Sequence, residues 1–420
     1  MSYQNKYLKY KKKYLELKGG ANFVGPIHFT YNSDQPITPA VLPANVTHLT
    51  FGNLFNQRIT PGVLPNSITH LTFGHLFNQP ITPGILPNSL THLIFGNKFD
   101  QFIAQRILPN TITHLTFGNS FNFYIAPGVL PTSLTILTFG NSFNQSIIRG
   151  VLPAPLTILI FGDSFNQPIE SGILPDSLTI LIFGDSFNNG TELFKEGILP
   201  DSLTHLTFGN QFDKRIGLKV LPNSLSHLIF GNSFNFYITP GVLPDSLTNL
   251  TFGASFDQPI LPRTLPAFLT NLTFGASFNQ PIALGTLPAS LTNLTLGAGF
   301  NQPIAPGILP NTLTHLIIHN DINVNVNELF TRFANLETVD LNNYRPAQQL
   351  TAEQIIENQS NAELKDRMIC PICMVNRKDT TLLCGHLLCS TCANNPLLRQ
   401  CPECRGTMQN KHRIFYGGSN

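Results

Sequence analysis

Seven thiols and one imidazole near the C-terminus have the composition of a metal centre. All seven cysteines of the 420-residue chain lie between Cys370 and Cys404. An odd number of cysteines in one short window argues against a disulfide framework and for metal binding in a reducing compartment. The ligand order is Cys370-x2-Cys373-x10-Cys384-x1-His386-x2-Cys389-x2-Cys392-x8-Cys401-x2-Cys404.

Eight soft ligands are the number that two tetrahedral zinc ions require. The set is complete only when His386 joins the seven cysteines, and it then leaves no thiol over. Four protein ligands at each ion leave no open position, so we expect two structural Zn²⁺ ions that activate no water. A segment this short needs bound metal ions to fold. The spacing alone does not decide whether the two sites are interleaved or sequential.

Composition excludes several classes of protein. Charged residues make up 11% of the chain, and the formal net charge is +2. This balance gives no field that marks nucleic acid as a partner, and no basic stripe flanks the cysteines. Pro, Asn or Gly interrupts every apolar stretch, so we expect no transmembrane segment. The basic N-terminus has no apolar region after it, so we expect no secretory signal.

A 22-residue repeat occupies the middle of the chain. Tetrads such as LTFG and LIFG recur with a spacing of 22 residues, apart from one spacing of 25 between Gly184 and Gly209. We expect the three extra residues to loop out around residues 190–197. The tetrads end at Gly52, Gly74, Gly96, Gly118, Gly140, Gly162, Gly184, Gly209, Gly231, Gly253, Gly275 and Gly297. Degraded units precede and follow this array, at Phe29 and Ile318.

The repeated columns predict short strands stacked in register. Leu93 and Phe95 alternate with His92 and Ile94, so the two pairs face opposite sides of a strand. Leu and Phe columns stacked on themselves form one continuous core, which a single coil cannot bury alone. An Asn or Asp follows the second Phe of every unit, and we expect it to form a buried ladder that satisfies backbone groups at the turn. The Gly after the strand permits positive φ or a close approach.

The units resemble a known repeat. The run from Leu-Pro-x-Ser-Leu-Thr through Phe-Gly to Phe-Asn-Gln-Pro-Ile, clearest at residues 64–81 and 287–304, is similar to the FNIP repeat of amoebal proteins and of amoeba-infecting giant viruses. The resemblance covers residues 29–318. It implies a leucine-rich-repeat-like, curved parallel β-solenoid.

One column of the strands faces away from the predicted core and is a candidate recognition surface. It contains a His block, an aliphatic block and an Asn block, with seven of the twelve histidines of the chain. The alternative is a solvated strand face filled by repeat duplication. A metal-binding His ladder is disfavoured, because each coil adds one His and no acidic or thiol partner. The column is His48, His70, His92, His114, Ile136, Ile158, Ile180, His205, His227, Asn249, Asn271, Asn293 and His315.

The segments outside the repeats differ in composition. Residues 1–20 combine six lysines with tyrosines that share one helix face, which predicts a basic, solvated N-terminal helix. A membrane-surface helix, a coiled-coil seam and an address signal are the alternatives. We expect the solenoid over residues 21–320, a cap at 321–345 with a helix and then a strand at Thr338–Leu341, a partly helical linker at 346–367, the zinc domain at 368–406 and a tail at 407–420.

The cysteine cluster resembles a RING finger of the C3HC4 type. The resemblance rests on Cys370-Pro-Ile-Cys373, Cys384-Gly-His386 and Cys401-Pro-Glu-Cys404-Arg405. It implies a cross-brace, with one zinc on Cys370, Cys373, Cys389 and Cys392. The second zinc would take Cys384, His386, Cys401 and Cys404.

The same resemblance implies a ubiquitin-protein ligase without a covalent intermediate. Ile372 and Pro402 would line the groove for the ubiquitin-conjugating enzyme, and Leu397 or Leu398 would replace the Trp that many active members have. Arg405 matches the residue that contacts both conjugating enzyme and ubiquitin, so catalysis would come from positioning. The expected partners are that enzyme, ubiquitin and a protein substrate on the solenoid, inside the cell and in the host cytoplasm. The alternative is a non-catalytic, zinc-dependent scaffold.

Overall fold

The structure is a computed structural model of the whole chain. It describes residues 27–39, 41–188 and 196–318 with their side chains, and four short strands further on by their backbone alone. The chain divides into two compact units, Met1–Pro346 and Ala347–Asn420. The N-terminal helix, the helix of the cap and the linker that the sequence predicts lie outside the described residues. Of the predicted tail, residues 411–413 are described, as a strand.

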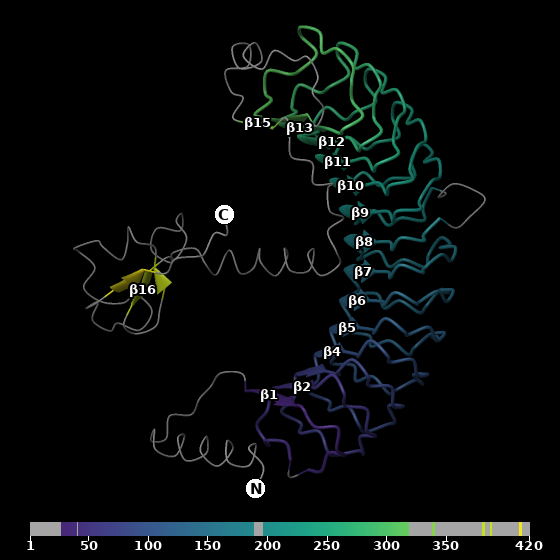
Figure 1. Cartoon of the computed structure of the whole chain (residues 1–420). Helices are drawn as coiled ribbons and strands as arrows, with labels where there is room; N and C mark the ends of the chain where they lie inside the picture. The colour runs from purple at the N-terminus through teal and green to yellow at the C-terminus, as the bar shows by residue number, and fades with distance from the viewer. Residues whose placement is uncertain are drawn as a thin grey trace. The chain divides into compact units, whose positions relative to one another are not determined.

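The first unit contains a parallel sheet of fifteen strands in sequence order, so the repeats form a solenoid (Figure 1). Each coil contributes one strand of three or four residues, and Figure 1 shows the strands along the inner side of the arc. The strands are β1 (His28–Tyr31), β2 (His48–Phe51), β3 (His70–Thr72), β4 (His92–Ile94), β5 (His114–Thr116), β6 (Ile136–Thr138), β7 (Ile158–Ile160), β8 (Ile180–Ile182), β9 (His205–Thr207), β10 (His227–Ile229), β11 (Asn249–Thr251), β12 (Asn271–Thr273), β13 (Asn293–Leu296), β14 (His315–Ile318) and β15 (Thr338–Asp340).

The register places each column on itself, as the period predicts. His70 pairs with His92 and Leu71 with Leu93 across β3 and β4. The degraded units at both ends are strands β1 and β14, and β15 adds the strand expected at Thr338–Leu341. Strands β8 and β9 pair in the same register, with Ile180 opposite His205, despite the longer spacing there. Residues 189–195, which include most of the segment predicted to hold the extra residues, lie outside the described residues.

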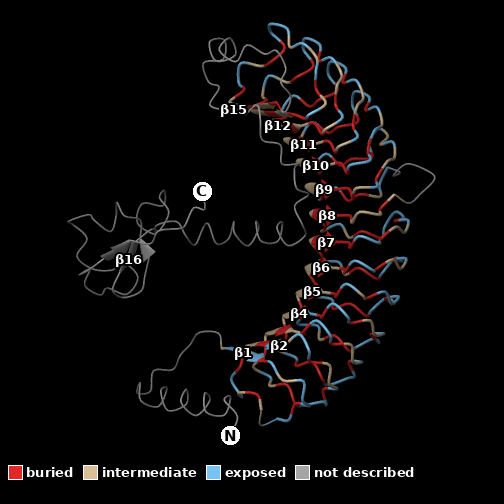
Figure 2. Cartoon of the chain, in the orientation of Figure 1, coloured by how far each residue is buried: buried red, intermediate tan, exposed pale blue. Residues whose placement is uncertain are grey.

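The core consists of stacked rings and leucines. Within one coil, the ring centroids of Phe95 and Phe99 lie 3.9 Å apart. Between coils, Phe95 lies 5.7 Å from Phe117, and Phe99 lies 6.2 Å from Phe121. Figure 2 shows buried residues running through the solenoid from coil to coil. A coil therefore buries its apolar face only against its neighbours, which is the reason that the repeats stabilise each other.

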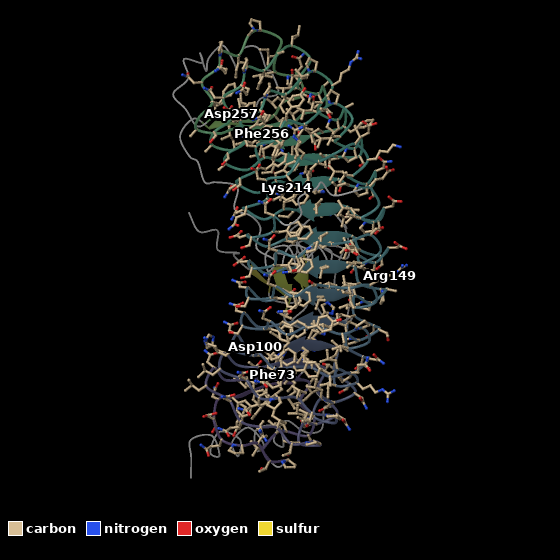
Figure 3. The ribbon with its side chains drawn as sticks, turned by 90° about the vertical axis from the view of Figure 1, so that its right-hand side faces the viewer. Phe73, Asp100, Arg149, Lys214, Phe256 and Asp257 are labelled. Atoms are coloured by element: carbon tan, nitrogen blue, oxygen red, sulfur yellow. The ribbon has the colours of Figure 1, made fainter. Side chains whose placement is uncertain are left out.

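The Asn/Asp ladder is present, but it is not buried. The Asn78 Oδ1 atom accepts hydrogen bonds from the Asp100 backbone N–H and the Gln101 Nε2, both at 2.9 Å. The ladder residues are half-buried or exposed, because their turn lies at the solvent edge of the coil. Figure 3 shows Asp100 and Asp257 along one edge of the solenoid and Arg149 along the opposite edge. The prediction of a ladder is confirmed, and the prediction that it is buried is wrong.

The tetrad glycines serve close approach rather than positive φ. A Cβ on Gly118 would overlap the carbonyl group of Gly96, and the same holds along the column from Gly74 to Gly297. Positive φ belongs instead to a second glycine column at the opposite corner, such as Gly62 at 81°. The sequence left both roles open for the tetrad glycines, and the structure selects the first.

The second unit contains a three-stranded antiparallel sheet. Its strands are β16 (Thr380–Leu382), β17 (Leu387–Leu388) and β18 (Lys411–Arg413), in the order β17-β16-β18. Thr380 pairs with Leu388 and Thr381 with Leu387. By their sequence positions, Cys384 and His386 belong to the four residues that connect β16 to β17.

Candidate functional site

The outward column of the strands forms a ladder of imidazole rings at β1–β5. Neighbouring ring centroids lie 4.0 Å apart from His48 to His70, from His70 to His92 and from His92 to His114. The interplanar angles of these three pairs are 11°, 12° and 18°, so the rings are stacked. His28 of β1 extends the ladder at 4.2 Å from His48. A shorter ladder, His205 and His227 at 4.1 Å, follows on β9 and β10.

A second ladder, of hydroxyl groups, orients the imidazoles. The residue before each ladder histidine from β2 to β5 is Thr, and its Oγ1 lies 2.8–3.0 Å from the Nδ1 of that histidine. The same Thr91 hydroxyl also donates to the carbonyl oxygen of Thr69 at 3.0 Å. Ser226 has this role before His227. Each hydroxyl thus lies between a carbonyl of the preceding coil and an imidazole of its own coil.

This arrangement fixes the orientation of the rings. The Thr91 hydroxyl has one proton and two partners, the carbonyl of Thr69 and the Nδ1 of His92. In either tautomer Nδ1 is hydrogen-bonded to Thr91, so Nε2 is the ring nitrogen left for other partners. The ladder presents a row of parallel Nε2 atoms on the strand face.

His70, His92 and His205 are neutral at pH 7. Burial first, and then the neighbouring rings, lower the pKa of His70 and His92 from 6.5 to about 4. The pKa of His205 falls to about 4 for the same two reasons. Burial also lowers the pKa of His48, His114 and His227. Asp, Glu, Lys and Arg are absent from strands β1–β14.

The aliphatic block differs from the rest of the face in its burial. Ile160 and Ile182 are 2% and 7% exposed, whereas Ile94, in the same column of β4, is 43% exposed. Ile158 and Ile180, in the histidine column, are buried as well. Figure 2 shows β7 and β8 as buried strands between half-buried ones. The sequence predicts the apolar composition of this block but not its burial.

The Asn block continues the column without titratable groups. Asn293 donates a side-chain hydrogen bond to the Oδ1 of Asn271. Thr248 donates to the Oδ1 of Asn249, and Asn271 donates to the hydroxyl of Thr270. The hydroxyl ladder therefore continues under the Asn block, so an Asn can replace a ladder His without changing the strand.

The described residues contain no group of three or more His, Cys, Asp or Glu side chains able to hold a metal ion. The stacked rings explain this result for the His ladder, because their Nε2 atoms lie side by side on near-parallel rings and do not converge on one point. Over residues 27–39, 41–188 and 196–318 the structure also has no helix with the length and apolarity that a bilayer crossing needs.

The residues predicted to bind zinc or a conjugating enzyme lie outside the described residues. They are Cys370, Cys373, Cys384, His386, Cys389, Cys392, Cys401 and Cys404 for zinc, and Ile372, Leu397, Pro402 and Arg405 for the enzyme. These assignments stay predictions.

Sequence reasoning missed two parts of the strand-face site. The predicted column began at His48, whereas the structure adds His28 of the degraded first unit. The hydroxyl ladder was also missed, although its signal was present: a Thr or Ser precedes every residue of the column from His48 to His315.

Short matches link the chain to ubiquitin ligases and RING-named proteins. It is 35% identical over 94 residues to the E3 ubiquitin-protein ligase bre-1 of Caenorhabditis elegans, which is 21% of this chain and 11% of that protein. It is 41% identical over 46 residues to RING finger protein 121R of Invertebrate iridescent virus 6, which is 11% of this chain and 49% of that protein. The chain thus spans at most about half the length of these relatives.

Solved structures share the solenoid. CroV588, described as a novel circular LRR protein, is 52% identical, with a TM-score of 0.67 over 71% of this chain and 44% of that chain. Toll, in a complex with Spatzle from Drosophila, is 15% identical with a TM-score of 0.56, over 76% of this chain and 48% of that chain, and it supports the fold alone.

A family model covers most of the chain. The FNIP Repeat model matches residues 31–75, 77–120, 121–164, 165–192, 192–233, 234–277 and 278–321. These ranges begin and end close to the first and last full coils of the sheet, at β1 and β14. The chain therefore belongs to the FNIP repeat family.

Proposed function

We propose that this chain is a RING-type ubiquitin-protein ligase whose solenoid recruits the protein substrate. The observation that carries the proposal is the spacing of seven cysteines and one histidine between Cys370 and Cys404. Thiolate and imidazole are the ligands that structural zinc prefers, and eight of them fill two tetrahedral sites. The short matches to E3 ubiquitin-protein ligases and to a RING finger protein support the same reading.

The backbone of the second unit is compatible with this ligand set. The antiparallel pair β16 and β17 is joined by only four residues, and Cys384 and His386 are two of them. A tight connection of this kind brings two ligands one residue apart toward one ion. Two zinc ions bound by Cys370, Cys373, Cys384, His386, Cys389, Cys392, Cys401 and Cys404 would fold the unit and would take no direct part in ubiquitin transfer.

In the proposed mechanism the chain acts by positioning. Ile372, Leu397 and Pro402 bind the conjugating enzyme, and Arg405 holds ubiquitin in its reactive pose, so the substrate amine attacks the thioester directly. Thiolate ligands need a reducing compartment, which places the chain inside the cell.

The strand face of the solenoid suits a role in substrate recruitment. Its outward columns contain no Asp, Glu, Lys or Arg in β1–β14 and are rigidly spaced by the sheet, with separate His and Asn blocks and a buried Ile block. A partner that binds there loses few solvated charges, and the His and Asn blocks offer hydrogen-bonding side chains at fixed positions.

Autoubiquitination of the zinc-loaded full chain tests the proposal. The wild type is incubated with activating enzyme, ubiquitin, ATP and a panel of conjugating enzymes. We expect ubiquitin chains with at least one enzyme, and a loss of about tenfold or more in Ile372→Ala and Arg405→Ala. Arg399→Ala is the matched control, because this arginine lies between zinc ligands but outside the expected groove.

Two outcomes oppose the proposal. Equal activity in the wild type, Ile372→Ala and Arg405→Ala contradicts the assigned contacts. The absence of ubiquitin chains with every conjugating enzyme favours a non-catalytic scaffold, a reading that the lack of any Trp in the chain also supports.

A further inference from the structure

The first five strands contain the only run of five histidines in one column of the described sheet. The ring centroids of neighbouring histidines in this run lie at most 4.2 Å apart. The run is His28, His48, His70, His92 and His114. The stack is held from below by the hydroxyl ladder, in which each Thr joins the preceding coil to its own histidine. The rings therefore contribute to the contact between coils as well as to the surface.

A proton on any of these rings acts against that contact. A second ring proton gives a ring a positive charge, and its neighbours lie only 4.0 Å away on both sides. At this distance two charges repel each other even at the surface of a protein. The hydrogen bond between Nδ1 and Thr does not compensate, because it is present before and after protonation.

Among the described residues, no opposite charge offsets this repulsion. The titratable groups that face the rings from β1–β5 are the rings themselves, and β6 presents Ile136. Tyr31 of β1 points into the core and is buried. The electrostatic influences on His70 and His92 likewise come from other rings of the stack. The strand face of β11–β13, in contrast, has Asn in the same column and no titratable group.

We propose that the stack from His48 to His114 is an acid-sensitive element, which holds the first coils together at neutral pH and releases them locally when its rings are protonated. Local release is possible because each coil of a solenoid contacts only its neighbours, so stability is a sum of local terms. Acid would then unfold the coils that carry this His block and leave the coils of the Asn block folded.

The direction of the effect follows from proton linkage. The pKa of His70 and of His92 is about 4 in the folded chain and 6.5 in an unfolded one. The unfolded coils therefore bind protons first as the pH falls. The stabilisation is complete above pH 6.5 and is lost progressively as the pH falls toward 4.

Hydrogen exchange with mass spectrometry tests the proposal on the full chain. Exchange is measured at pH 7.0 and at pH 4.5 and is corrected for the intrinsic rate. We expect backbone amides of β2–β5 to lose protection by about tenfold or more at the lower pH, after allowance for solvent screening, and those of β11–β13 to keep it. This readout does not involve ubiquitin, so it stands apart from the proposed ligase activity.

The chain itself suggests the control variant. Asn occupies the same column at Asn249, Asn271 and Asn293, so His70→Asn with His92→Asn inserts a side chain that this sheet already accepts. We expect the double variant to keep its protection at pH 4.5. His315→Asn, at the far end of the column, is expected to behave as the wild type does in β2–β5.

Three results would overturn the proposal. One is an equal loss of protection from β2 to β13, and another is an unchanged loss in the double variant. If the double variant lacks native protection at pH 7.0, an NMR titration of the wild-type imidazoles decides: His70 and His92 titrating at 6.5, as in an unfolded chain, would contradict it.

Discussion

Gly96 lies directly over Gly74, so closely that a Cβ atom on Gly96 would overlap the carbonyl group of Gly74. The same carbonyl accepts a hydrogen bond from the backbone N–H of Phe77 at 3.1 Å, which closes the turn after strand β3. The distance between two coils is therefore set by a glycine on one and a backbone carbonyl on the other.

The change Gly96→Ala tests this contact. The methyl group must push the two coils apart or break the turn at Phe77, so we expect the free energy of unfolding to fall by about 3 kcal/mol or more. Urea unfolding followed by circular dichroism measures the loss. Gly217→Ala is the control, because the nearest atom to its Cβ would be Val220 Cγ2 at 3.6 Å, an ordinary contact. Equal effects of the two changes would refute the assigned role.

Arg106 occupies a backbone conformation that suits glycine. Its φ is 66°, and the equivalent residues of neighbouring coils are Gly84 and Gly128 at 82° and 78°. We therefore expect Arg106→Gly to stabilise the chain by about 1 kcal/mol. Thermal unfolding compares it with Arg149→Gly, at a corner residue without positive φ, where the change is expected to be neutral or destabilising. A lower melting temperature for Arg106→Gly would contradict this account of the corner.

The side-chain oxygen of Asn78, rather than its amide nitrogen, supports the next coil. Removing it in Asn78→Ala leaves the Asp100 N–H and the Gln101 amide without this acceptor, so we expect a loss of about 1–3 kcal/mol. Asn78→Asp keeps the acceptor and is expected to restore most of the stability. The chain already uses Asp in this way, since Asp257 Oδ1 accepts from the Asn279 N–H at 2.9 Å. Equal destabilisation by Ala and Asp would show that the loss of the Oδ1 acceptor does not cause the loss of stability.

The period predicted most of the solenoid because each coil repeats the same local choices. Leu93 and Phe95 face the core while His92 and Ile94 face outward, as their alternation predicts. The role of the tetrad glycines could not be assigned from the sequence, since close approach and positive φ both select glycine. The position of Arg106 could not be foreseen either, because an arginine gives no sign of positive φ.

The strand-face site could be predicted only in part. The column from His48 to His315 followed from the period, but the orientation of its rings depends on the Thr and Ser residues next to it. The contrast between Ile94 and Ile160 shows a second limit, since the same residue type in the same column is exposed in one coil and buried in another. The period predicts which residues are neighbours along the sheet, but it does not predict how exposed a given strand position is.

The zinc centre is the claim on which the proposed ligase depends, and elemental analysis of the purified full chain tests it most directly. Seven thiolates and one imidazole that form two tetrahedral sites require two zinc ions per chain, and chelation should remove both the metal and any ubiquitin transfer. Cys373→Ser and Cys401→Ser are each expected to lower the zinc content, whereas substitution of His315 is not. A measured content of two zincs agrees with the account. Fewer than two zincs in reduced, folded protein, or cysteines found in disulfides, would contradict it.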